Sequence, residues 1–142
     1  MDGAMRTVGK HPDRDAAISH RMIGRPLRVL VVDDEPGICD VFRDALGRLQ
    51  HRVTTCTTGQ RAAEEAACQA FDIVFIDIMM PGMNGRQVLR VLRERLPKAL
   101  FIMITGFPDS KLVEGCFEEG AFLCLAKPVS LYEILDLING LS

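Results

Sequence analysis

The sequence lacks several features that would assign it to whole classes of protein. Its 17 Lys and Arg residues against 19 Asp and Glu give a formal net charge of −2, so there is no basic excess to neutralise a nucleic-acid backbone. No apolar run approaches the roughly 20 residues that a membrane-spanning helix needs, and residues 1–21 contain no apolar core of a signal peptide. We therefore expect a cytoplasmic protein that binds neither nucleic acid nor a membrane directly.

Closely spaced cysteine pairs are also missing. The five cysteines lie at positions 39, 56, 68, 116 and 124, and no two of them have the C-x-x-C spacing of zinc and redox sites. All five fall within apolar or helical patterns. We expect buried or half-buried free thiols, as found in a reducing compartment.

The length of 142 residues suffices for one domain with a hydrophobic core. Residues 1–26 are a polar mixture with Gly and Pro and no sustained periodicity, which predicts a mobile N-terminal extension. Short apolar runs of strand length then recur, and residues 27–142 are expected to form the domain. The predicted strands are residues 27–32, 51–56, 71–77, 99–105 and 121–126.

A helical pattern follows each of these runs. The predicted helices run from Pro36 to Leu49, from Gly59 to Ala70, from Arg86 to Leu96, from a cap at Asp109 or Ser110 to Gly120, and onward from a cap at Ser130. Strands that alternate with helices through short loops indicate an α/β domain, a doubly wound five-stranded parallel sheet with five helices. The polar run HRVTTC is expected near the edge of that sheet.

Polar residues end four of the five expected strands. Asp33 and Asp34 close the first, Asp77 the third, Thr105 the fourth, and Lys127 the fifth. Functional groups in such folds gather outside the carboxyl ends of the strands. We therefore expect these side chains to lie close together.

These residue types suit a site for a cation and a phosphoryl group. Carboxylates are ligands for Mg²⁺, and an aspartate such as Asp77 can also attack phosphorus to form an acyl phosphate. The Lys127 ammonium can neutralise a carboxylate and hold a phosphoryl oxygen, which the Thr105 hydroxyl can also bind. Each residue alone has an ordinary explanation as a helix cap, a turn residue or a solvated charge, but such explanations would have to hold at four strand ends together.

Four stretches, VLVVDDEPGI, FDIVFIDIMMPGMNG, FIMITG and LAKPVS, resemble the receiver (phosphoacceptor) domain of bacterial two-component response regulators. The resemblance covers about residues 27 to 141. It implies the flavodoxin-like, receiver-type fold and a signalling switch that assists its own phosphorylation and dephosphorylation without being a conventional enzyme. It also implies partners: a sensor histidine kinase or phosphotransfer protein as donor, and a downstream protein or fused output domain.

The resemblance implies roles for individual residues. Asp33 and Asp34 match the acidic pair that binds Mg²⁺, together with Asp77 and the backbone carbonyl of Met79. Asp77 matches the aspartate that is phosphorylated. Lys127 matches the lysine that contacts the phosphoryl group, and Glu35 commonly accompanies the acidic pair.

Thr105 matches the hydroxyl residue of the family's conformational switch. Family members usually carry an aromatic residue three positions before the lysine, and here that position is Cys124. Phe122 is two residues away and is expected on the same face by strand alternation. The phosphorylation chemistry should survive this departure, whereas the usual coupling between threonine and aromatic ring is not expected in its ordinary form.

Two other functions compete with the receiver hypothesis. A Mg²⁺-dependent phosphohydrolase would use Asp77 as nucleophile, but haloacid-dehalogenase-like phosphatases carry an acid/base aspartate where this sequence has Met79. A docking module that takes no phosphate is disfavoured because all the polar site residues are present. The sequence leaves open whether the domain stands alone or was excised from a longer regulator, and whether Leu137 and Leu141 on the last helix support a homodimer.

Overall fold

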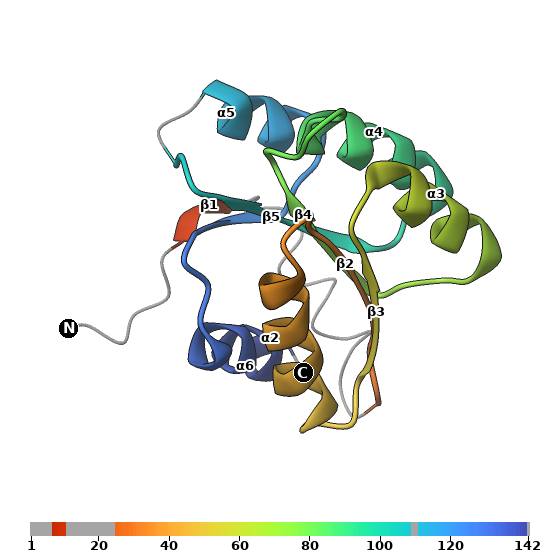
Figure 1. Ribbon diagram of the computed structural model, residues 1–142, viewed down its shortest axis with the longest axis vertical. Coiled ribbons are helices and arrows are strands. Elements are labelled where there is room, and N and C mark those ends of the chain that lie inside the picture. Colours follow the sequence, from red (N-terminus) through yellow and green to blue (C-terminus); the bar gives the residue numbers. More distant parts are fainter. Residues whose placement is uncertain (1–6, 11–24, 109–110, 142) are drawn as a thin grey trace.

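The computed structural model describes residues 7–10, 25–108 and 111–141 as a single six-stranded sheet with helices on both faces (Figure 1). The strands are β1 (Thr7–Lys10), β2 (Arg28–Val32), β3 (Arg52–Cys56), β4 (Ile73–Asp77), β5 (Leu100–Thr105) and β6 (Leu123–Ala126). The helices are α2 (Pro36–Gly47), α3 (Gly59–Cys68), α4 (Gly85–Arg95), α5 (Lys111–Glu118) and α6 (Leu131–Leu141). None of these helices is long and apolar enough to cross a membrane.

The sheet order is β1-β6-β5-β4-β2-β3, and β2 to β6 are parallel to one another. This confirms the predicted doubly wound five-stranded parallel core. The polar strand β3 lies at one edge, as its composition predicts. The apolar strands β4 and β5 are central and buried along their whole length, because helices cover both faces of a parallel sheet.

Helices α2 and α6 cover one face of the sheet, and α3, α4 and α5 cover the other (Figure 1). The alternation of side chains along each strand fills both layers. In β4, Phe75 packs with the α2 and α6 layer, where it meets Phe42 with ring centroids 4.5 Å apart. Its neighbours Val74 and Ile76 pack with the α3–α5 layer.

Local capping fixes where several helices begin. The Thr58 side chain accepts a hydrogen bond from the Arg61 backbone at α3, and Asn84 and Gln87 form a reciprocal capping box that starts α4 one residue earlier than predicted. Ser130 caps α6 as predicted, accepting from the Glu133 backbone at 3.2 Å. The caps predicted at residues 109 and 110 lie outside the described residues.

Two predictions were wrong, and one question that the sequence left open is answered. The first helix was predicted to run to Leu49, but α2 ends at Gly47 and Leu49 is 37% exposed, since the chain turns through a left-handed residue at Gln50 (φ 64°). The sequence left open whether Leu137 is exposed and supports a homodimer; it is buried in the core and supplies no exposed contact, and the side chain of Leu141 lies outside the described residues. Four cysteines are buried free thiols as expected, whereas Cys68 is exposed.

The structure adds a strand that the sequence pattern did not predict. Residues Thr7–Lys10, within the predicted mobile extension, form β1 and pair antiparallel with β6. Four residues are too short a run for periodicity to identify, and the pairing depends on a distant strand. The rest of the extension, residues 1–6 and 11–24, lies outside the described residues.

Candidate functional site

The carboxyl ends of the parallel strands bring the predicted acidic residues together. Carboxylate oxygens of Asp33, Asp34, Glu35 and Asp77 all lie within 4.8 Å of one another. Asp33 follows β2 directly and Asp77 is the last residue of β4, and these two strands are hydrogen-bonded neighbours. The cluster therefore forms because parallel strands place their ends at the same edge.

Lys127 enters this cluster from the end of β6. Its Nζ lies 2.6 Å from Glu35 Oε1, 3.2 Å from Asp77 Oδ2 and 3.3 Å from Asp33 Oδ2. The Lys127 backbone N–H donates to the Thr105 carbonyl at 2.7 Å, which ties the residue after β6 to the end of β5. The Lys127–Pro128 peptide bond is cis. One ammonium thus bridges carboxylates from two different strand ends.

Burial raises the pKa of the two central carboxyl groups. Asp33 is 0% and Asp77 is 3% exposed. Burial, and then the charge of Asp33, raise the pKa of Asp77 to about 6, although the Met79 N–H and Lys127 favour its ionised form. Burial likewise raises the pKa of Asp33. Burial alone would lower the pKa of Lys127, but the hydrogen bond to Glu35 and the charges of Asp33 and Asp77 raise it overall.

The polar atoms of the cluster fit a hard cation. Asp33 Oδ2 is fully buried and accepts no hydrogen bond, although it is in ion-pair contact with Lys127. A buried carboxylate oxygen without a donor is costly unless a positive group approaches it. Four clustered carboxylates and a single lysine leave an excess of negative charge, and oxygen donors are those that Mg²⁺ prefers. The donor set therefore suits Mg²⁺.

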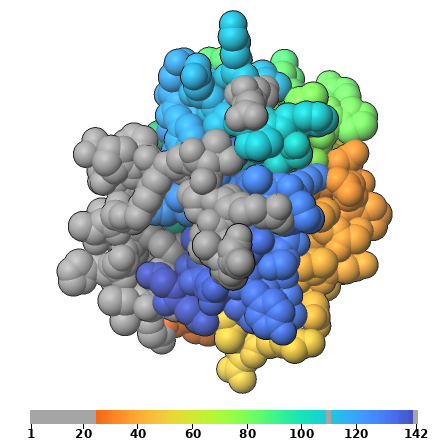
Figure 2. Space-filling view, turned by 90° about the vertical axis from the view of Figure 1, so that its left-hand side faces the viewer, coloured from red at the N-terminus to blue at the C-terminus, as the bar shows by residue number. Residues whose placement is uncertain are grey.

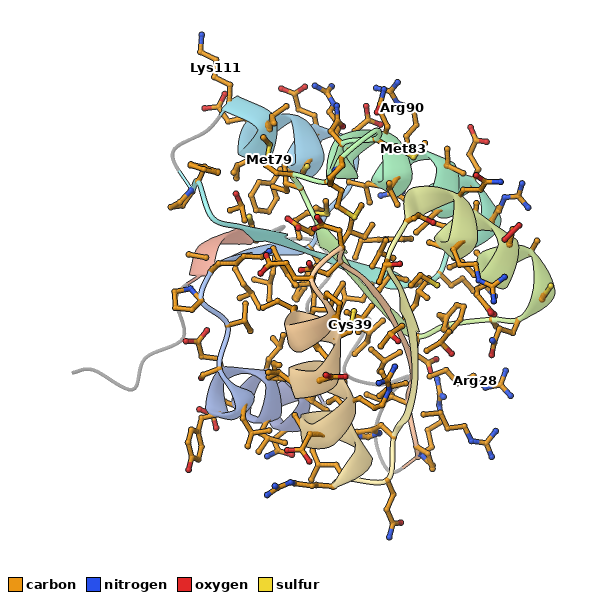
Figure 3. All side chains as sticks on the ribbon, viewed as in Figure 1. Arg28, Cys39, Met79, Met83, Arg90 and Lys111 are labelled. Carbon is orange, nitrogen blue, oxygen red and sulfur yellow. The ribbon has the colours of Figure 1, made fainter. Side chains whose placement is uncertain are left out.

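The loop after β4 is held close to the site. The Met79 N–H donates to Asp77 Oδ1 at 3.1 Å, and the Gly85 N–H donates to the Ile78 carbonyl at 2.6 Å. A Cβ on Gly85 would lie 2.4 Å from the Asp77 carbonyl oxygen, so only glycine permits this return of the chain. The Met79 side chain is 49% exposed, and Figure 3 shows Met79 and Met83 on the side of the sheet that carries α3, α4 and α5.

Thr105, the last residue of β5, is fully buried beside this edge. Its hydroxyl accepts a hydrogen bond from the Phe107 backbone N–H at 2.9 Å. The Thr105 side chain therefore binds the loop that follows β5 in this structure. The side chain of Phe107 in that loop is 65% exposed.

Cys124 is fully buried in the layer formed by α3, α4 and α5, and burial raises the pKa of its thiol to about 12. Phe122 packs in the opposite layer, with α2 and α6. The prediction that these two residues share a face was wrong, because β6 begins at Leu123 and alternation does not extend to the residue before it.

The sequence indicated Glu35 only as a companion of the acidic pair and did not predict its contact with Lys127. Glu35 makes the shortest contact of Lys127, and its backbone N–H donates to Asp33 Oδ1 at 2.9 Å. Its place directly after Asp34, at the start of α2, was the available signal. Its contribution depends on the packing of β6 beside β5, which no local pattern reveals.

Comparisons with known proteins agree with this geometry. Residues 29–139 match the model of the response regulator receiver domain family, so the chain belongs to that family. Receiver domains are the phosphoacceptor switches of two-component signal transduction and are phosphorylated on aspartate.

Two curated relatives illustrate the match. The chain is 35% identical over 116 residues to the transcriptional activator protein PfeR of Pseudomonas aeruginosa, covering 82% of this chain and 37% of PfeR. It is 30% identical over 115 residues to the regulatory protein VanRB of Enterococcus faecalis, covering 81% of this chain and 52% of VanRB. The chain thus spans between about a third and a half of these relatives. Among solved structures, a BeF3-activated DrrB receiver domain is similar with a TM-score of 0.74 at 28% identity, covering 82% of this chain and 97% of that one.

Proposed function

We propose that this chain is a phosphorylatable signalling receiver in which Asp77 accepts a phosphoryl group with the aid of Mg²⁺. The observation that carries the proposal is the setting of Asp77: a buried carboxylate at a strand end, 3.2 Å from the Lys127 ammonium and inside a cluster of four carboxylates. A nucleophilic carboxylate, a cation site and a compact ammonium are the groups that phosphoryl transfer to aspartate requires.

The chemistry follows from these groups. A carboxylate oxygen of Asp77 attacks the phosphorus of a phosphohistidine on a sensor kinase or phosphotransfer protein. The new O–P bond forms as the P–N bond breaks, and the electron pair leaves with the imidazole nitrogen, which takes up a proton. Lys127 offsets charge on the transferring oxygens.

The metal would be held by Asp33, Asp34 and Asp77 with the backbone carbonyl of Met79. When bound, Mg²⁺ neutralises charge that develops on the phosphoryl oxygens. Asp33 and Asp77 lie in the buried part of this cluster, and Asp34 is half-buried at its rim. The buried oxygen Asp33 Oδ2, which accepts no hydrogen bond, supports this assignment.

We propose that Thr105 and Cys124 form the switch that reads the phosphorylated state. The Thr105 hydroxyl would leave the Phe107 N–H for a phosphoryl oxygen, so the loop that begins at Gly106 would move. No aromatic ring accompanies Thr105 from position 124, and Cys124 is fully buried. The response would therefore pass through the β5–α5 loop to a downstream protein or fused output domain.

A phosphohydrolase is not favoured. Its acid/base residue would fall at Met79, whose thioether cannot transfer a proton. The chain is therefore proposed as a switch that assists its own phosphorylation and dephosphorylation.

Labelling with a small phosphodonor tests the proposal. Incubation with acetyl phosphate and Mg²⁺ should add one phosphoryl group of about 80 Da to the intact mass, as expected for a covalent aspartyl intermediate. Asp77→Asn should abolish the addition, whereas Asp40→Asn, which changes an exposed aspartate on α2, should not. Labelling that persists in the Asp77 variant, or that a chelator leaves unchanged, would refute the assignment.

A further inference from the structure

The two long edges of the parallel core are protected in different ways. β3 carries its own protection, because its sequence RVTTC begins with an exposed arginine and continues with half-buried residues. Charged and polar side chains on an edge strand discourage pairing with other chains. β6 has the sequence LCLA, without charge or proline, and its residues Leu123, Cys124 and Leu125 are buried. Nothing in the sequence of β6 itself protects its outer edge.

β1 covers that outer edge with backbone. Thr7 is paired with Leu125, Gly9 with Cys124 and Lys10 with Leu123, in antiparallel register with an irregularity between Thr7 and Gly9. The family match begins at residue 29, so β1 lies outside the part of the chain that matches the family. Figure 2 shows the left-hand side of the view in Figure 1, with cyan residues of the β5–α5 region above the blue residues of the C-terminal part.

We propose that the outer edge of β6 is a strand-pairing site that the chain's own residues 7–10 fill as a removable cover. A strand edge binds any extended segment through main-chain hydrogen bonds, with little demand on its side chains. β1 is only four residues long and its register is interrupted, and short elements held by few hydrogen bonds open at a low free-energy cost. Opening would expose the unprotected edge to an extended segment of a partner.

The covered strand leads directly into the candidate phosphoacceptor site. Thr7 pairs with Leu125, and Lys127 follows two residues later with its Nζ among the carboxylates. β1 therefore pairs with the strand whose end positions Lys127. The strand-pairing site itself does not depend on the proposed phosphorylation, so each proposal can fail alone.

Hydrogen exchange on the intact chain tests whether β1 covers β6. Val8→Pro/Gly9→Pro removes two backbone donors from β1 and should weaken its pairing. Amides of residues 123–126 that face β1 should then exchange at least about tenfold faster than in the wild type. Val8→Thr is the matched control, since a β-branched residue keeps the backbone donor, and it should leave exchange unchanged. Amides of β3 serve as the internal reference, and a cooperative urea unfolding transition of the variant verifies that the domain is folded.

A labelled peptide with the sequence of residues 5–12 tests whether the edge accepts a segment in trans. The peptide should bind the double-proline variant saturably and bind the wild type at least about tenfold more weakly, because a filled site must first open. Equal exchange of β6 amides in variant and wild type would overturn the proposal, as would failure of the peptide to bind the opened variant. A wild-type dimer that the proline pair dissociates would show that a second copy supplies β1, and would overturn the cover within one chain.

Discussion

The two ends of the parallel sheet handle buried polar groups in opposite ways. At the carboxyl end, four carboxylates cluster, three of them contact Lys127, and Asp33 Oδ2 accepts no hydrogen bond. At the amino end, Asp72 accepts two hydrogen bonds from the Arg25 guanidinium, at 2.6 and 3.0 Å, and one from the Arg28 N–H at 2.8 Å. His51 Nδ1 accepts a hydrogen bond from the Leu27 N–H at 2.9 Å.

The difference indicates that the carboxyl end serves function and the amino end serves stability. Satisfied polar contacts stabilise a fold, whereas buried like charges weaken it and keep groups ready for a ligand. Mutations at the carboxyl end should therefore change phosphorylation, and mutations at the amino end should change stability. Four predictions test this division, in order of decreasing effect.

Removing the ammonium at the carboxyl end should have the largest effect. Lys127→Met should slow phosphorylation by acetyl phosphate by at least about 100-fold, because one preorganised group that stabilises transition-state charge contributes about that factor. Time-resolved intact-mass measurement gives the rate. Lys98→Met, an exposed lysine before β5 at the amino end, is the control and should retain the wild-type rate. A loss of less than tenfold in the Lys127 variant would contradict its assigned role.

Neutralising the central carboxylate should stabilise the metal-free protein. The pKa of Asp77 is raised to about 6 in the fold from an ordinary value of 3.8, so the wild type loses stability as pH rises from about 4 to 6 and ionises the buried group. Asp77→Asn does not titrate and should gain about 2 kcal/mol near pH 8 in the presence of a chelator. Urea unfolding measures the free energy of unfolding of both proteins. Mg²⁺ should reduce the difference between them, because it stabilises the wild type. Destabilisation by this substitution would count against the contrast between the two ends.

Breaking the amino-end contacts should cost stability without affecting phosphorylation. Asp72→Ala leaves the Arg28 N–H and the Arg25 guanidinium without their carboxylate, which should cost about 2 kcal/mol in urea unfolding. Asp40→Ala removes an exposed pair with Arg43 and should cost less than about 0.5 kcal/mol. The phosphorylation rate of the Asp72 variant should match that of the wild type. A tenfold decrease would contradict the assignment of the amino end to stability alone.

The smallest effect is expected at His51. Burial lowers the pKa of its imidazole from 6.5, so its neutral form is favoured in the fold and its contribution is complete above about pH 7. Stability should fall as pH drops through 6.5, since protonated Nδ1 cannot accept the Leu27 N–H. An NMR titration should place the imidazole midpoint below 6.5. His51→Gln should reduce the change in stability between about pH 8 and 5.5 by about 1 kcal/mol.

Much of the fold could be predicted because hydrophobic periodicity is a local property. Four of the five parallel strands read as apolar runs and β3 as a more polar one, and the helices read as helical patterns between them. An error occurred where tertiary contacts overrode local pattern: Phe122 lies before its strand and packs in the opposite layer from Cys124. The burial of Leu137, which the sequence left open, also depends on such contacts.

The proximity of the candidate site residues could also be predicted. Asp33, Asp34, Asp77 and Lys127 each lie at the end of a strand, and parallel pairing brings these ends together. Their roles stay a prediction. The dominant contact of Lys127 with Glu35 was not predicted, since it joins residues 92 positions apart. The orientation of Thr105 toward Phe107 also depends on the loop that follows β5.

The sequence alone determined the alternation of strands and helices and the residue types at each strand end, because both follow from short-range pattern and chemistry. Only the tertiary structure decided which strands are neighbours, how deeply Asp33 and Asp77 are buried, and that β1 covers β6. These properties arise from contacts between distant segments, whose burial and pairing energies no local stretch contains.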